Sequence, residues 1–150
     1  QVKNGRDGDD TWTQIPLQAG KWLHITYVHK DKKTTVYVNG KVQKGFENSA
    51  ITFGENSMIV VGNSGYRNDY LREIRLWDKA LTESEINDYL YLPMDPATPH
   101  LISYLPLSKE METKDLKAPA GTENVTTKAH IEYVENVKFP ADELVIVNQE

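Results

Sequence analysis

Residues 70–90 carry the most specific local pattern in the sequence, a strand that turns into a capped helix. Leu71, Ile74 and Leu76 are apolar with charged residues between them, and Trp77 ends the run. This alternation favours a half-buried strand over an amphipathic helix.

A helix start follows directly in the sequence. Thr82 is a good N-cap residue, and Glu85, three positions later, completes the pattern of a capping box. Leu81 and Ile86 stand where a hydrophobic staple places its two apolar residues. The sequence therefore predicts one short helix at about residues 82–90.

Short β-rich runs precede this stretch at regular spacing, and turn residues separate them. They are residues 12–17, 22–29, 34–38, 41–44, 51–53 and 58–62. Asn39-Gly40, between two of these runs, is the dipeptide most typical of a tight β-hairpin. Many short strands with a single helix predict an all-β sandwich.

The chain after the helix continues the same domain. Residues 91–100 hold three prolines and read as a crossover connection. Residues 101–147 are expected to supply terminal strands and a long exposed loop, so that residues 1–150 form a single domain.

Composition excludes several classes of protein. The net charge is −5 and acidic and basic residues are interspersed, so no basic patch indicates nucleic acid as a partner. No apolar run approaches the ~20 residues that a membrane-spanning helix needs. The absence of cysteine excludes disulfides, thiolate metal sites and cysteine nucleophiles.

Four blocks of the sequence together resemble a known family. They are Trp-Leu-His-Ile-Thr-Tyr at 22–27, Val-Tyr-Val-Asn-Gly-Lys at 36–41, Ile-Val-Val-Gly at 59–62, and the strand and helix start at 73–86. In this order they resemble a laminin G-like domain of the concanavalin A-like lectin/glucanase superfamily, in the form found in bacterial surface proteins.

A second, looser match lies after the helix. Residues 101–107 and Lys114-Asp115-Leu116 are similar to the segment that closes such domains in bacterial surface proteins. The resemblance implies an antiparallel jelly-roll β-sandwich. Such domains usually have more chain before the position of Trp12, so we expect the first strands upstream of Gln1, or their equivalents in 101–147.

Catalysis by this chain is not expected. Glucanases of this superfamily place paired carboxylates on one face of one strand, where they serve as acid and nucleophile. No such pattern occurs here. Glu73 lies two residues from Arg75, on the same face, where we expect an ion pair. Glu132 and Glu135 are three residues apart and would point to opposite faces.

Calcium is the metal that the resemblance implies, held by loop oxygens. Asn63 and Asp69 are the candidate ligands, although their spacing matches no recognised calcium loop and a solvated loop is the alternative. The histidines lack the pair spacing of a zinc site.

Glycan binding requires exposed aromatic side chains together with amide or charged partners. The candidates are Trp12, Tyr66, Arg67, Asn68 and Tyr70. The alternative is that Tyr70 packs in the core and Tyr66 shields its loop. Trp22 and Trp77 are expected to pack rather than to bind a ligand.

These observations leave three functional hypotheses in order. The first is a non-catalytic module that binds carbohydrate or mediates adhesion, within a bacterial glycan-utilisation protein at the cell surface, secreted or in the periplasm. The second is a structural module whose partner is a surface protein. The third is a glycoside hydrolase, for which the sequence offers no suitable carboxylates.

Overall fold

The fold was analysed in a computed structural model of the chain, which describes residues 2–4, 11–13, 20–47, 70–122, 125 and 133. For residues 2–4, 11–13 and 44–47 it describes the backbone alone. Several predicted strands lie outside the described residues. They are those at 51–53 and 58–62, and the terminal strands expected after residue 122, where the structure describes only residues 125 and 133.

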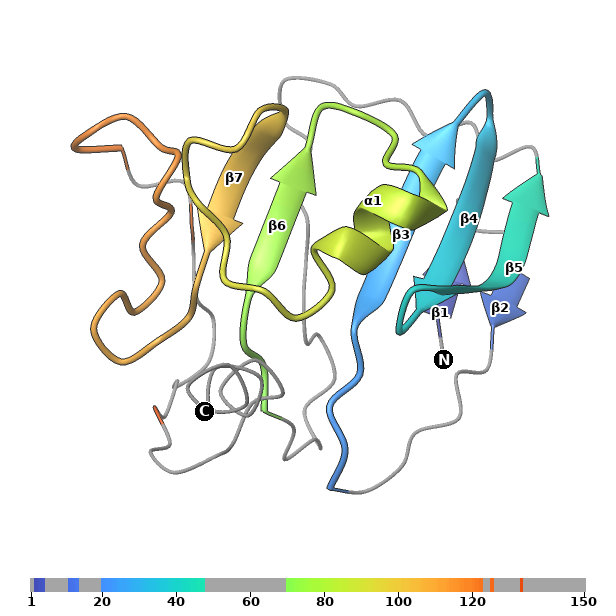
Figure 1. The fold of residues 1–150 in the computed structure, drawn as a ribbon, viewed down its shortest axis with the longest axis horizontal. Coiled ribbons are helices and arrows are strands. Elements are labelled where there is room, and N and C mark those ends of the chain that lie inside the picture. Colours follow the sequence, from blue (N-terminus) through green and yellow to red (C-terminus); the bar gives the residue numbers. More distant parts are fainter. Residues whose placement is uncertain are drawn as a thin grey trace, which may run out of the picture.

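Seven strands and one helix make up the described part of the chain (Figure 1). The strands are β1 (Val2–Asn4), β2 (Thr11–Thr13), β3 (Ile25–Lys30), β4 (Lys33–Val38), β5 (Lys41–Glu47), β6 (Ile74–Trp77) and β7 (Leu101–Leu105), and the helix is α1 (Glu83–Asp88). All pairs are antiparallel, in the orders β1-β2, β3-β4-β5 and β6-β7. The predicted class, all-β and antiparallel with one short helix, is confirmed.

Two tight turns set the register of the three-stranded sheet. Asn39 and Gly40 both have positive φ, at 48° and 75°, which is the geometry of a type I′ hairpin turn. Asp31 and Lys32, between β3 and β4, also have positive φ, at 51° and 61°. The right-handed twist of the strands favours such turns, so local sequence determines this sheet.

The helix begins as the sequence predicts. The Thr82 hydroxyl accepts a hydrogen bond from the Glu85 amide, and the Glu85 carboxylate accepts one from the Thr82 amide at 2.9 Å. Ile86 is 2% exposed and anchors the inner face of α1. A helix this short is not stable alone. Capping and the burial of Ile86 therefore stabilise it in place.

Helix α1 packs against the turn between β4 and β5. The Asn87 side chain donates hydrogen bonds to the carbonyls of Gly40, at 3.2 Å, and of Glu83, at 2.7 Å. A Cβ atom at position 40 would lie 2.0 Å from Asn87 Oδ1. Gly40 therefore serves both the turn and the approach of the helix, which is a contact between residues 47 positions apart.

The β6-β7 pair forms the second part of the fold. Met94, Leu101 and Tyr104 are buried together, and Trp77, Tyr89 and Leu116 pack against this cluster. Strand β7 begins at residue 101, where the terminal strands were expected to start, and the Pro-rich connection at 91–100 leads into it. The cluster thereby joins the last strand to the chain around α1.

Several elements differ from the predicted bounds. Strand β3 begins at Ile25 rather than at residue 22, and β6 begins at Ile74, after residues 70–73, which have no regular secondary structure. Strand β2 ends at Thr13 rather than at residue 17, and it pairs with β1, which was not predicted as a strand from the sequence. Among the described residues, no helix has the length and apolarity to cross a membrane.

The Gly40 contact predicts a specific loss of stability. Gly40→Ala places a Cβ at positive φ and forces the Asn87 amide away from the Gly40 carbonyl. We expect the free energy of unfolding, measured with urea, to fall by about 1 kcal/mol through backbone strain and by about 1 kcal/mol through the lost hydrogen bond.

Gly20→Ala is the matched control, because Gly20 has a similar φ of 74° and no atom within 4 Å of the added Cβ. It should lose only the backbone contribution. In an Asn87→Ala background the cost of Gly40→Ala should fall to that of Gly20→Ala. Equal costs for the two glycine variants in the unaltered chain would contradict this account.

Candidate functional site

Tyr70 is the predicted glycan-binding residue whose side chain the structure describes. It is 61% exposed and lies four residues before Ile74, where β6 begins. Core packing of Tyr70, the alternative considered from the sequence, is therefore wrong. Trp12 lies in the middle of β2, opposite Lys3, and only its backbone is described. The other candidates lie outside the described residues. They are Tyr66, Arg67 and Asn68 for glycan, and Asn63 and Asp69 for calcium.

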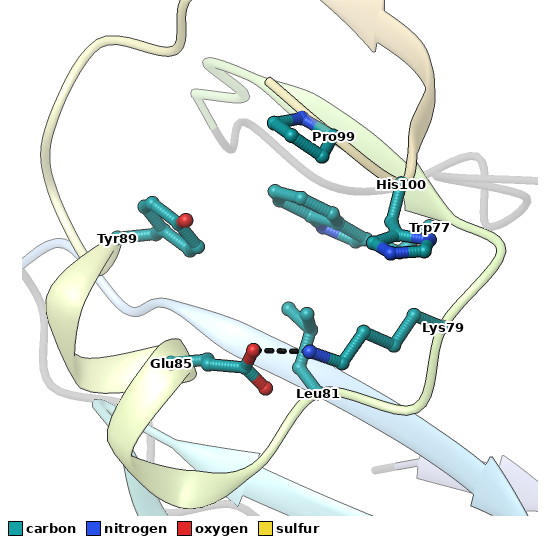
Figure 2. A pocket seen from close by; sticks show the side chains of 7 residues that line it. All are labelled: Trp77, Lys79, Leu81, Glu85, Tyr89, Pro99 and His100. Carbon is teal, nitrogen blue, oxygen red and sulfur yellow. Dashed lines mark hydrogen bonds and ion pairs between the residues drawn. The ribbon is translucent and has the colours of Figure 1, made fainter.

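A pocket of about 190 Å³ opens between the end of β6, helix α1 and the end of the Pro-rich connection (Figure 2). Its lining combines aromatic and apolar side chains with polar or charged ones. The first kind is Trp77, Leu81, Tyr89 and Pro99, and the second is Lys79, Glu85 and His100. No pattern in the sequence indicated this pocket.

Two aromatic rings form one side of the pocket. The rings of Trp77 and Tyr89 are stacked, with centroids 5.4 Å apart and planes inclined by 19°. The predicted packing role of Trp77 is confirmed, because it contacts the buried cluster around Leu101. Both rings are only half-buried. Trp77 therefore has a packed side and a side that faces the pocket.

Charged side chains line the opposite side of the pocket (Figure 2). Lys79 forms an ion pair with Glu85, the residue that also caps α1. Hydrogen bonds from the Lys79 ammonium and from the Thr82 amide lower the pKa of Glu85 to about 2. The carboxylate therefore stays ionised, and the pair has no net charge. Beside it, His100 Nδ1 lies 2.8 Å from an Asp78 carboxylate oxygen.

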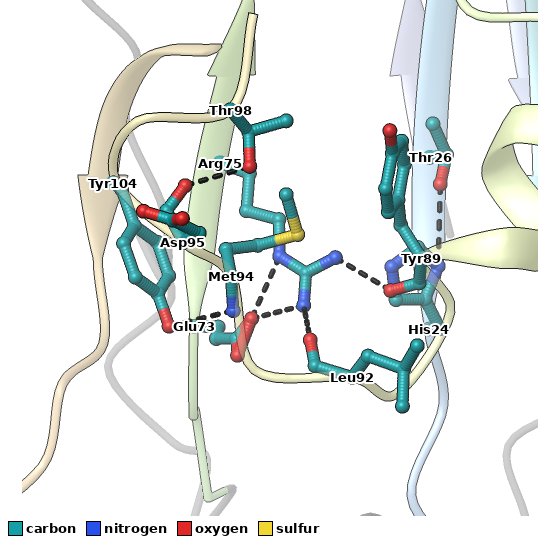
Figure 3. A network of polar contacts seen from close by, with 10 residues as sticks. All are labelled: His24, Thr26, Glu73, Arg75, Tyr89, Leu92, Met94, Asp95, Thr98 and Tyr104. Atoms are coloured by element: carbon teal, nitrogen blue, oxygen red, sulfur yellow. Dashed lines mark hydrogen bonds and ion pairs between the residues drawn. The ribbon is translucent and has the colours of Figure 1, made fainter.

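Arg75 holds the backbone that carries Tyr89 (Figure 3). Its guanidinium donates hydrogen bonds to the carbonyls of Tyr89 and Leu92, both at 2.6 Å, and to the Glu73 carboxylate, at 2.7 Å from Nε. The predicted Glu73–Arg75 ion pair is confirmed. Glu73 is thus a partner of a fixed cation, and this geometry does not suit a general acid.

A second polar cluster joins strand β3 to the chain after α1. The Asn39 side-chain oxygen accepts hydrogen bonds from the His24 amide and from the Tyr91 hydroxyl, both at 2.9 Å. The His24 ring meets the Tyr91 ring edge-on at 6.2 Å, and its Nδ1 lies 3.2 Å from the Thr26 hydroxyl. His24 therefore packs and hydrogen-bonds within the fold.

Burial of His24, with a smaller contribution from the nearby Arg75 guanidinium, lowers its pKa from 6.5 to about 4. The imidazole is neutral in the folded protein at neutral pH. A protonated His24 would lose contact with water and would be repelled by the Arg75 guanidinium, so the neutral form is favoured.

Asp115 is a buried carboxylate with a structural role. It accepts hydrogen bonds from the Ser103 hydroxyl at 2.7 Å, the Tyr104 amide at 3.0 Å and the Lys117 amide at 2.9 Å. Asp115, from the Lys114-Asp115-Leu116 segment, thus attaches this segment to β7. Within the described ranges, no group of three or more His, Asp or Glu side chains is placed to hold a metal ion.

His24 predicts an acid-dependent loss of stability. The unfolded chain binds a proton at His24 near pH 6.5, whereas the folded protein does so near pH 4. Stability is therefore lost as the pH falls from 6.5 towards 4. The shift corresponds to about 3 kcal/mol, which partial exposure reduces to about 2 kcal/mol.

Urea unfolding of the unaltered chain and of His24→Gln, from pH 8 to pH 4, measures this contribution. The difference between the two proteins should be constant above pH 7 and should shrink as the pH falls, because glutamine does not titrate. Parallel pH profiles down to pH 4 would refute the role of His24.

Comparison with known proteins adds the family. A family model described as the concanavalin A-like lectin/glucanases superfamily matches residues 1–87, which is more than half of the chain. No match was found among curated proteins or among solved structures. The matched region contains β1 to β6 and most of α1. The chain therefore belongs to the concanavalin A-like lectin/glucanases superfamily, as a laminin G-like domain.

Proposed function

We propose that this chain is a non-catalytic accessory module that binds carbohydrate or mediates adhesion, within a bacterial glycan-utilisation protein. Its place would be the cell surface, the periplasm or the extracellular medium. The observation that carries the proposal is an exposed tyrosine, Tyr70, on a laminin G-like scaffold. Exposed aromatic rings are the side chains that stack on sugar rings.

The state of the described carboxylates supports a binding role over a catalytic one. Glu73 is paired with Arg75, and Asp115 is saturated by donors from β7 and its own turn. Glu85 is held ionised by Lys79 and Thr82. Each of these three carboxylates is therefore committed to contacts within the fold. Domains of this family are usually non-catalytic, in agreement with the proposal.

A second candidate function is docking to a surface protein. Ile25 and Tyr27 lie on the same face of β3, two residues apart, and are 41% and 53% exposed. Exposed apolar side chains on one strand face are typical of a protein contact. This face is distinct from Tyr70, so variants of the two surfaces separate the functions.

Binding of the 150-residue chain to a glycan array, with calcium and with EDTA, tests the first function. We expect at least one glycan to bind, and Tyr70→Ala to weaken binding by about fivefold or more through loss of the stacking ring. Loss of binding in EDTA would add a calcium site to the proposal.

Ile102→Ala is the control, because Ile102 is 52% exposed on β7 and belongs to neither proposed surface. It should bind as the unaltered chain does. No glycan bound under either condition would leave protein docking as the function. Hydrolysis of a bound glycan would instead contradict the non-catalytic assignment.

A further inference from the structure

We infer that the pocket between Trp77, Tyr89 and the Lys79–Glu85 pair is a subsite for one neutral sugar ring. This inference rests on the carbohydrate-binding function proposed above and assigns it a site separate from Tyr70. The pocket is formed by side chains that lie at the end of β6, on α1 and in the connection to β7.

The size of the pocket limits its ligand. Its volume is about 190 Å³. Pockets for drug-sized molecules begin at about 300 Å³. The space therefore suits a single six-membered sugar ring, such as the residue at the end of a glycan, and is too small for two or more linked sugars.

The chemistry of the lining matches the two kinds of surface on a sugar. A pyranose has apolar C–H faces, which pack on aromatic rings, and a rim of hydroxyl groups. Trp77 and Tyr89, which stack on each other and are both partly buried, line the pocket with aromatic surface, and Pro99 extends the apolar side. Across the pocket, Lys79 and Glu85 supply a donor and an acceptor for hydroxyl groups.

The charge of the lining favours a neutral sugar over an acidic one. Lys79 and Glu85 form a pair without net charge, and His100 is hydrogen-bonded to the Asp78 carboxylate. An acidic sugar would have to compete with Glu85 for Lys79, and its carboxylate would lie close to that of Glu85. Repulsion of this kind is how binding sites reject a wrong ligand.

The pocket is also held by fixed parts of the fold. Trp77 ends β6, and the Tyr89 carbonyl is bound by Arg75. Leu81, at its base, is 9% exposed. A site on supported elements loses little conformational entropy on binding, which favours recognition of a small ligand.

Titration of the 15N-labelled chain with free glucose, galactose, mannose and N-acetylglucosamine, and with glucuronate as the acidic comparison, tests the inference. The Trp77 indole N–H signal, assigned through Trp77→Phe, reports on the pocket. We expect a saturable shift with at least one neutral sugar, and a weaker effect or none with glucuronate.

Two variant pairs locate the binding. Tyr89→Leu should lower the affinity for the sugar by about fivefold or more. Tyr89→Phe keeps the aromatic ring and should lower the affinity less. Lys79→Ala should weaken binding, and the matched exposed lysine variant Lys21→Ala should not. Lys79 forms only an exposed ion pair, so its loss leaves the fold intact.

The outcomes separate this inference from the proposed function. The subsite would be overturned if the Trp77 signal does not shift with any sugar. It would also be overturned if Tyr89→Leu and Lys79→Ala both bind sugar with the affinity of the unaltered chain. Glycan binding on the array that persists in those variants would leave the carbohydrate function standing and the subsite refuted. Failure of both the array and the titration would refute both.

Discussion

The buried guanidinium of Arg75 is the interaction on which the described fold most depends. Its side chain is 10% exposed, and a charge so placed is tolerated only if its donors are satisfied. Glu73 supplies the counter-charge, and the carbonyls of Tyr89 and Leu92 accept the other hydrogen bonds. One side chain of β6 thereby fixes the path of the chain after α1.

This arrangement also explains how such a short helix ends. Helix α1 has no basic residue in its last turn, where a cation would interact favourably with the exposed carbonyls. Arg75 supplies that cation from a neighbouring strand, at the carbonyl of the C-cap residue Tyr89. Lysine would be a poor substitute, because the bonds to two carbonyls and a carboxylate require the planar, multidentate guanidinium.

The features that the sequence predicted are those whose causes lie close together in the chain. The capping box joins Thr82 to Glu85, the hairpin turn needs only Asn39 and Gly40, and the Glu73–Arg75 pair spans two residues. Each of these patterns has a local physical reason, and each is present in the structure.

The features that the sequence did not reveal depend on contacts between distant segments. Asn39 was interpreted as a turn residue alone, yet its side chain binds the His24 amide, 15 residues away, and the Tyr91 hydroxyl, 52 residues away. The pocket likewise requires Trp77, α1 and residue 99 to meet in space. Periodicity and capping rules concern neighbouring residues and do not predict contacts between distant parts of the sequence. Of the glycan-binding residues predicted from sequence, only Tyr70 has a described side chain, which is exposed, and its role in binding stays a prediction.

The same polar residues that build the scaffold thus determine where a ligand is able to bind. Glu85 caps α1 and is held ionised, so it contributes to the pocket as a fixed acceptor with its own counter-ion. Tyr89 is the C-cap, so the backbone bond to Arg75 that ends the helix also positions its ring against Trp77. Tyr70, by contrast, lies before β6 in a segment without regular structure. A ligand at Tyr70 would gain from an exposed ring, whereas a ligand in the pocket would gain from groups that folding has already ordered, and the second gain costs less entropy on binding.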